Sequence, residues 1–282
     1  MTKFFQDSVG YCMISTRIED AMAMSPLIAD DQRKELDEAL TEWFRTSSVH
    51  DNGTNEPARI MLSKNVLRWR YRLSRIILHR PLLLLHAMRK TNRGGMTSHQ
   101  IDSIETCRKA GGELITDIAT TWQGQKACQF SGTHAAWILY QAAMVPLLSM
   151  FSDYRDADIV ADCSRQVEVA KAALLDLQPW SLMAKQCLES VRLLHEASRR
   201  YSAQQQSQPD PHSTLTQWSN ASAQLSPDGG SLHDLDICDG TKHDSLSISS
   251  HDQFFSNDIL DNLYWYTDWD SMDYVHDLQH AE

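Results

Sequence analysis

The pattern of apolar positions predicts helices along the first two hundred residues of the chain, and no alternating run there indicates a strand. The most informative stretch is 65–90. Two mainly apolar strips run along it at helical spacing: Leu67, Tyr71, Ser74 and Leu78 form one, and Trp69, Leu73, Ile76 and Ile77 form the other. A helix that is apolar over most of its circumference packs among other helices. This stretch is therefore predicted to lie at the centre of an all-α domain.

A basic stripe fills the gap between these two strips. It consists of Arg68, Arg72, Arg75 and His79, which fall together at about 100° per residue. The stripe could bind phosphate, or it could be a solvated edge or a set of partners for acidic residues on neighbouring helices. No aromatic side chain within the stripe would stack a base, and the flanking surface is apolar, which favours the second interpretation. We expect water to reach the helix along this one edge.

Pro81 interrupts the same stretch. Proline lacks the amide that closes the preceding helical turn, so the helix is expected to kink or end near Arg80. Residues 82–90 would then begin a new helix or continue at an angle.

Apolar spacing predicts one or two helices within 4–29 that end before Pro26, and further helices over 32–45, 99–123, 132–151, 159–177 and 180–201. The apolar positions expected to be buried in 4–29 are Phe5, Val9, Cys12 and Met13, and Asp30 and Asp31 are expected to cap the helix over 32–45. Gly111 and Gly112 in mid-helix indicate that another helix packs closely there. The run 135–150 is apolar on all sides, so we place it inside the domain and consider it too short to span a bilayer comfortably.

Charge divides the chain into two parts. Residues 202–282 contain thirteen Asp, one Glu and one Lys, a net charge of 1 − 14 = −13, whereas residues 1–201 carry 25 bases and 23 acids, a net charge of +2. Residues 202–250 are rich in Gln, Ser, Asp, Pro and Gly and are predicted to be a disordered linker, because so polar a segment cannot offset its ordering entropy. The predicted organisation is a helical domain over 1–201, this linker, and a last segment over 251–282.

Apolar side chains return in the segment 251–282, where seven Asp separate them. Closely spaced acids repel one another and hold bulky side chains in water, available to the groove of a partner. The residues expected to bind such a partner are Phe254, Phe255, Ile259, Leu263, Trp265 and Trp269. Helical folding on binding is one possibility for this segment, and a last helix docked on the domain is the alternative.

Three stretches of the domain resemble a known family when they are taken in order. They are Leu36-x3-Leu40-x2-Trp43, then Tyr71-x4-Ile76-Ile77-Leu78-His79-Arg80-Pro81-Leu82, then a hydrophobic helix around Tyr140-Gln141-Ala142. The arrangement is similar to the middle homology region of fungal zinc-cluster transcription factors of the yeast galactose-regulon activator type. The resemblance covers about residues 36–201.

The resemblance implies a nuclear activator of transcription by RNA polymerase II. In that family the helical domain is regulatory and responds to an inducer or a repressor partner, while an acidic, aromatic C-terminal segment recruits coactivators. The family's zinc-binding DNA module has six cysteines in CxxC-type spacing. The six cysteines here stand at Cys12, Cys107, Cys128, Cys163, Cys187 and Cys238, so no zinc and no DNA contact is expected from this chain. The chain would be the C-terminal part of a longer factor, or a shortened factor.

Candidate catalytic chemistry is weak in this sequence. There is no HExxH or GxSxG motif, and no paired carboxylates or activated nucleophile. His79 and His86 stand about two turns apart and could face one way, but core or surface roles are expected for both. We therefore expect no enzyme, no catalytic or metal-binding residue and no membrane partner. Competing hypotheses are a helical protein that binds a small molecule and an adaptor that binds proteins without DNA-binding activity.

Overall fold

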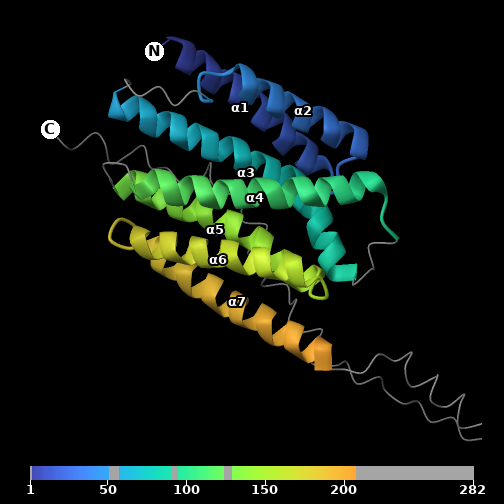
Figure 1. The fold of residues 1–282 in the computed structure, drawn as a ribbon. Helices are drawn as coiled ribbons and strands as arrows, with labels where there is room; N and C mark the ends of the chain where they lie inside the picture. Colours follow the sequence, from blue (N-terminus) through green and yellow to red (C-terminus); the bar gives the residue numbers. More distant parts are fainter. Residues whose placement is uncertain (1, 51–56, 90–94, 124–128, 208–282) are drawn as a thin grey trace, which may run out of the picture. The chain divides into compact units, whose positions relative to one another are not determined.

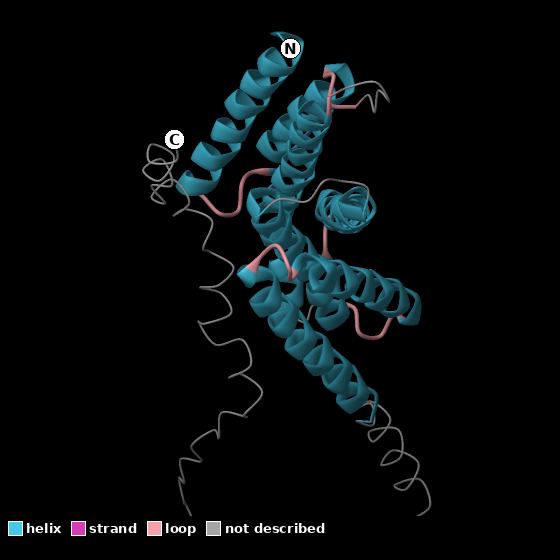
Figure 2. Cartoon of the chain, turned by 90° about the vertical axis from the view of Figure 1, so that its left-hand side faces the viewer, coloured by secondary structure: helices cyan, strands magenta, loops and turns pink. Residues whose placement is uncertain are grey.

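The computed structural model describes residues 2–50, 57–89, 95–123 and 129–207, which contain seven α-helices and no strand (Figures 1 and 2). The helices are α1 (Thr2–Met24), α2 (Asp30–Thr46), α3 (Ala58–Arg89), α4 (Ser98–Gln123), α5 (Gln129–Ser152), α6 (Ala157–Leu177) and α7 (Leu182–Ser207). The prediction of an all-α domain is confirmed for these residues. All seven helices belong to one compact unit, Met1–Ala223. The segment 251–282 and most of the predicted linker lie outside the described residues.

Helix α3 is the element on which the domain is built. It packs against α1 and α2 on one side and against α4 and α5 on the other. Trp69 and Ile76 are fully buried, as the two apolar strips predicted. The helix continues through Pro81, and Figure 1 shows its last part turning away from the direction of the first. The predicted change of direction is therefore confirmed, and the helix does not end there.

An aromatic cluster joins α1 and α2 to α3. The rings of Phe44 and Tyr71 stack with centroids 4.2 Å apart, and Trp43 lies 6.0 Å from Tyr71. On α1, the hydroxyl of Tyr11 forms a hydrogen bond of 2.7 Å with that of Ser74. Trp43 also donates from Nε1 to the Asp7 carbonyl at 2.9 Å, which fixes α1 along α2.

The predicted buried face of α1 is wrong. Tyr11 and Ile18 are buried, whereas Phe5, Val9, Cys12 and Met13 are exposed. Helix α1 carries apolar residues on two opposite sides, and the side that fits the aromatic cluster also has the hydroxyl that Ser74 binds. Apolar spacing alone cannot distinguish two such sides.

Helix α5 occupies the interior, as predicted, and packs against α3, α4, α6 and α7. Its segment Ser131–Ser152 is long and apolar enough to cross a membrane, so the expectation that it was too short is corrected. However, 78% of its most apolar window is buried within the domain, as in the central helix of a bundle. The apolar character of α5 is explained by packing.

Two helix ends differ from their predictions. Helix α2 begins at Asp30, with Ala29 as N-cap and no side-chain cap. Asp30 and Asp31 therefore stand in its first turn, where their negative charges interact favourably with the positive end of the helix dipole. Helix α7 continues past the predicted end at Tyr201 to Ser207. The hydroxyl of Ser202 bonds to the Ser198 carbonyl at 3.0 Å and is buried with it, so the helical packing extends into the predicted linker.

Close packing at the two adjacent glycines of α4 is confirmed. A Cβ added at Gly111 would lie 3.0 Å from Cβ of Val145 on α5, and one added at Gly112 would lie 3.2 Å from the side-chain amide of Gln166 on α6. The first neighbour is a branched core side chain near its own backbone, and the second is the end of a flexible chain. Both positions are tight, but only one can adjust easily.

This difference predicts opposite effects for one substitution made at the two glycines. Replacing Gly by Ala inside a helix gains about 1 kcal/mol of intrinsic helix stability. Gly112→Ala should keep most of this gain because Gln166 can swing away. Gly111→Ala should lower stability by about 1–2 kcal/mol because Val145 cannot. Thermal and urea unfolding of both variants measures the difference, and equal effects would contradict the packing at Gly111.

Candidate functional site

The residues predicted to bind a coactivator lie outside the described part of the chain. This applies to all six: Phe254, Phe255, Ile259, Leu263, Trp265 and Trp269. Their role stays a prediction. Within the described residues, three arrangements have functional interest: the basic stripe of α3, a polar cluster around Asp153, and a groove beside that cluster.

Asp37 of α2 binds one half of the basic stripe. Arg75 donates to its two carboxylate oxygens over 2.6 and 2.9 Å, and His79 Nε2 lies 3.4 Å from Oδ1. The other ring nitrogen of His79 lies 2.6 Å from the hydroxyl of Ser103 on α4. Burial alone would raise the pKa of Asp37, but the contact with His79 and the hydrogen bonds and positive charge of Arg75 lower it far below its ordinary value.

Asp117 of α4 binds the other half of the stripe. Arg68 Nε and Arg72 Nη1 each donate to its Oδ2 at 2.8 Å. Arg72 also lies 3.6 Å from Glu113, one turn earlier on α4. The carboxylates of α2 and α4 therefore neutralise the stripe from both sides.

The basic stripe is an internal seam, and the expectation that water reaches the helix along it is wrong. The side chains of Arg68, Arg72, Arg75 and His79 are at most 18% exposed. The positive charge of the three arginines is neutralised by Asp37 and Asp117, so the stripe is not available to phosphate. Of the two interpretations, partnership with acids on neighbouring helices is the one that holds.

A buried hydrogen bond joins two of the stretches on which the family resemblance rests. Arg80 Nη1 donates to the side-chain carbonyl oxygen of Gln141 at 2.9 Å, with both residues less than a tenth exposed. Arg80 stands in the stretch that ends at Leu82, and Gln141 stands in the apolar helix α5. A buried amide and a buried guanidinium each need a partner, so this contact accounts for two polar residues in apolar surroundings.

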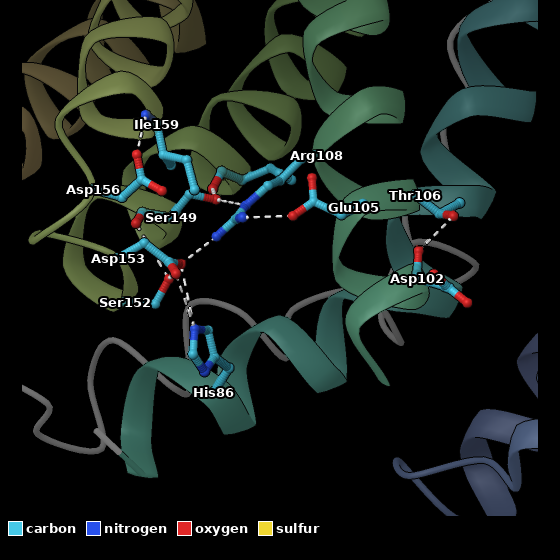
Figure 3. Close-up of polar contacts among 11 residues, drawn as sticks. His86, Asp102, Glu105, Thr106, Arg108, Ser149, Ser152, Asp153, Asp156 and Ile159 are labelled. Atoms are coloured by element: carbon cyan, nitrogen blue, oxygen red, sulfur yellow. Dashed lines mark hydrogen bonds and ion pairs between the residues drawn. The ribbon is translucent and has the colours of Figure 1, made fainter. Parts of the chain in front are cut away.

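The polar cluster brings together α3, α4 and the end of α5 (Figure 3). Arg108 forms an ion pair with Asp153, donates to Ser149 at 3.0 Å and reaches Glu105 at 3.0 Å. His86 Nε2 lies 3.3 Å from the Asp153 carboxylate oxygen that Arg108 also contacts. Burial would raise the pKa of Asp153, but the hydrogen bond from Ser152 and the charges of Arg108 and His86 lower it.

His79 and His86 do not form a joint site. Their imidazoles bind different carboxylates, Asp37 and Asp153, at separate places along α3. Among the residues that the structure describes, no three His, Cys, Asp or Glu side chains are grouped so that they could hold a metal ion.

A groove of about 410 Å³ lies beside the polar cluster, between α4, α5 and α6. Val145, Pro146 and Ile159 line its apolar part, and Lys109 and Asp158 are exposed charged residues among its lining. The volume lies within the range of pockets that bind small molecules.

The buried thiols and one buried imidazole have low chemical reactivity. Cys163 lines the groove, and burial raises its pKa to about 11, so it is a thiol at neutral pH and a poor nucleophile. Burial, followed by the charge of Arg70, lowers the pKa of His134 to about 4, so this imidazole is neutral. Of the described cysteines, only Cys12 is exposed.

Apolar spacing along the chain did not reveal the carboxylates that bind the basic stripe. Asp37 follows the buried Leu36, and Asp117 lies between the buried Ile115 and Ile118. The sequence contains one indication of each ion pair, a single acid beside the apolar face of a predicted helix. The arginines that this acid binds are more than thirty residues away. Pairing across helices depends on packing geometry, which spacing within one helix does not contain.

No family model, no curated protein and no solved structure matches this chain. Its function is therefore inferred from its own residues and from the resemblance described above.

Replacing Asp37 by Asn tests how much its contacts with the basic stripe stabilise the protein. The change keeps the shape and leaves Arg75 and His79 without their carboxylate. We expect it to destabilise the protein by about 2–3 kcal/mol at pH 7, less than a fully buried pair because the Asp37 side chain is 19% exposed. Glu35→Gln, which removes an exposed pair with Arg17, should cost less than about 1 kcal/mol and serves as the control.

The same variant should differ in its response to acid. The folded-state pKa of Asp37 lies below its unfolded value of about 3.8, so its contribution is complete above that value and is lost as pH falls below it. Urea unfolding from pH 7 to pH 2 should show a constant difference in the free energy of unfolding between the wild type and Asp37→Asn down to about pH 5. This difference should then become smaller below about pH 4. A difference that grows in acid would refute the ion pair.

Proposed function

We propose that this chain is a regulator of transcription by RNA polymerase II of the fungal zinc-cluster type. Its helical domain is regulatory, and its segment 251–282 recruits coactivators in the nucleus. The observation that carries the proposal is the division of charge and apolar residues along the chain. A near-neutral helical domain is followed by 81 residues of net charge −13, whose last part intersperses Phe, Leu, Trp and Tyr with seven Asp.

The internal ion pairs of the basic stripe on α3 support the proposal that the helical domain does not itself bind DNA. A DNA-binding surface needs several cations that are free to neutralise phosphates. Arg68, Arg72 and Arg75, the strongest candidates in the sequence, are bound to carboxylates of the same chain. DNA contact then requires an additional module, in which zinc would also be held.

The contact between Arg80 and Gln141 also supports the proposed family. One stretch contains a His-Arg-Pro-Leu sequence and the other a Tyr-Gln-Ala core, and a buried hydrogen bond joins them. In this proposal the helical domain tunes the C-terminal segment, either by binding an inducer or by binding a repressor protein.

A second candidate function is the binding of a small molecule without any role in transcription. The groove between α4, α5 and α6 favours it, because a volume of about 410 Å³ can hold a small ligand. A protein-interaction adaptor is the third alternative, in which the acidic segment binds a partner without effect on transcription.

A reporter assay separates these functions. Residues 202–282 are fused to an unrelated DNA-binding domain, and residues 202–250 fused in the same way provide a matched control that lacks the aromatic segment. The longer fusion should raise reporter output well above that of the DNA-binding domain alone, and the shorter one should not. Output at the background level from both fusions would remove the activator function and leave the ligand-binding and adaptor alternatives.

Within that assay, we expect the aromatic side chains to matter more than any one acid. Burying a Phe, Trp or Leu in a partner groove contributes about 1.5–3 kcal/mol, whereas an exposed ion pair contributes about 0–1 kcal/mol. Replacing Phe255, Leu263, Trp265 and Trp269 together by Ala should abolish most activation. Single Asp→Asn changes should lower it only slightly.

The matched control for the four Ala changes is the replacement of four Asp by Asn at Asp252, Asp258, Asp261 and Asp268. Losing several acids together should reduce output by more than the sum of the single changes, because the apolar groups would then collapse on one another. Output that survives the four Ala changes but falls in proportion to each lost Asp would replace the aromatic mechanism by a contact through charge alone.

A further inference from the structure

Two adjacent arginines precede a serine in the last turns of α7, in the sequence Arg199-Arg200-Tyr201-Ser202. They are the only adjacent arginines in the chain. A protein kinase that selects its substrates by charge binds such arginines with carboxylates beside its active site. Arginines three and two residues before a serine then bring its hydroxyl to the γ-phosphate of ATP. The spacing here fits a kinase of this kind.

Both guanidinium groups are available to such a partner. Arg199 is exposed and forms no ion pair with the residues that the structure describes. Arg200 pairs with Glu196, one turn earlier on α7, and these two side chains are 73% and 60% exposed. Exposed pairs of this kind are weak, so a carboxylate of the kinase can replace Glu196 at little cost.

The hydroxyl that would accept the phosphate is buried in the folded helix. Ser202 is 9% exposed, and its Oγ donates to the Ser198 carbonyl at 3.0 Å. Phosphoryl transfer requires this oxygen to reach both the γ-phosphate and the catalytic carboxylate of the kinase. The end of α7 must therefore open before the transfer takes place.

Few side chains attach the end of α7 to the rest of the domain. The ring of Tyr201 packs against those of Phe151 and Tyr154, with centroids 5.7 and 5.5 Å apart. The two residues after Ser202 are exposed, and Figure 1 shows the last turns of α7 at the margin of the described helices. The last four carbonyl groups of a helix also lack partners within it, so helix ends open more readily than their middles.

A phosphate on Ser202 does not fit the folded end of α7. The phosphorylated oxygen has no proton to donate to the Ser198 carbonyl. A group with a charge of about −1.5 to −2 would also be placed at a site that is 9% exposed, at a high cost in desolvation. Ser202 stands in the last two turns of α7, toward the negative end of the helix dipole, where a phosphate is repelled.

We propose that Ser202 is a phosphorylation site for a protein kinase that recognises arginine, and that its phosphorylation releases the end of α7 from Phe151 and Tyr154. The Ser202 oxygen attacks the γ-phosphorus of ATP, and the kinase carboxylate takes the hydroxyl proton. The bond between the γ-phosphorus and the oxygen of ADP breaks, and ADP leaves with the electron pair. This modification depends on no part of the proposed role in transcription.

Phosphorylation of the full chain by the catalytic subunit of cyclic-AMP-dependent protein kinase, with Mg-ATP, tests the site. Tandem mass spectrometry should find the phosphate on Ser202, and Ser202→Ala should abolish it. Replacing Arg199 and Arg200 together by Gln should lower the rate at least about tenfold, because two charge-assisted contacts are lost. Circular dichroism checks that each variant keeps its helices.

Ser198 is the matched control in this experiment. It is fully buried and precedes both arginines, so it should stay unmodified. A chain that receives no phosphate on Ser202, or receives it at the same rate without the two arginines, overturns the proposal. Phosphorylation of Ser198 in place of Ser202 overturns it as well.

Tyr154→Ala tests the opening of the helix without changing the sequence that the kinase recognises. Loss of the ring contact with Tyr201 should raise the rate of phosphorylation at Ser202 about two- to tenfold. Phe5→Ala, which removes an exposed ring on α1, should leave this rate unchanged. A rate that stays the same or falls in Tyr154→Ala would contradict opening at this contact.

Hydrogen exchange of the phosphorylated chain tests the release of the helix end. The backbone amides of 202–207 should lose their protection when Ser202 carries a phosphate, while those of α1 to α4 should keep theirs. The unphosphorylated chain and Ser202→Ala treated with the same kinase provide the reference. Amides of 202–207 that stay protected after phosphorylation would overturn the release.

Discussion

The burial of charged side chains on α3 constrains the rest of this domain. A central helix that carries three arginines and a histidine on one stripe can be covered only by helices that bring carboxylates to it, because unpaired buried charge is costly. Asp37 on α2 and Asp117 on α4 meet this need from two sides, at 2.6–2.9 Å. The two ion-paired sets fix the rotation of α2 and α4 about α3. If α2 or α4 were rotated by one residue, its carboxylate would no longer reach the arginines of α3, and its apolar contacts would be lost as well.

Polar contacts of the same kind continue along the interior. Arg80 reaches Gln141 on α5, and Arg108 of α4 reaches Asp153 at the end of α5. Apolar packing alone would allow α5 to slide or rotate, since it is hydrophobic on all sides, whereas each of these contacts permits one register. The domain thus combines an apolar interior with a few buried polar contacts that select one arrangement, and its groove beside Arg108 is held by this framework.

The proposed roles of the helical domain and of the C-terminal residues match the way in which charge is distributed and paired along the chain. The helical domain neutralises its strongest cluster of cations internally. The excess acid of the chain is confined to the residues after 201, of which 208–282 lie outside the described part. This separation keeps the aromatic side chains of 251–282 among acids, in the context that the proposed recruitment of coactivators requires.

The sequence by itself determined the all-α class, the approximate bounds of the helices, the change of direction at Pro81 and the close packing at Gly111, because each depends on local spacing or on the chemistry of one residue. It could not determine which acids bind Arg68 and Arg75, because Asp117 and Asp37 are distant in the chain and only packing brings them near. Nor could it choose between the two apolar sides of α1. The tertiary structure decided that choice, since only the side with Tyr11 completes the aromatic cluster with Trp43 and binds Ser74, while the side with Phe5 and Val9 stays exposed.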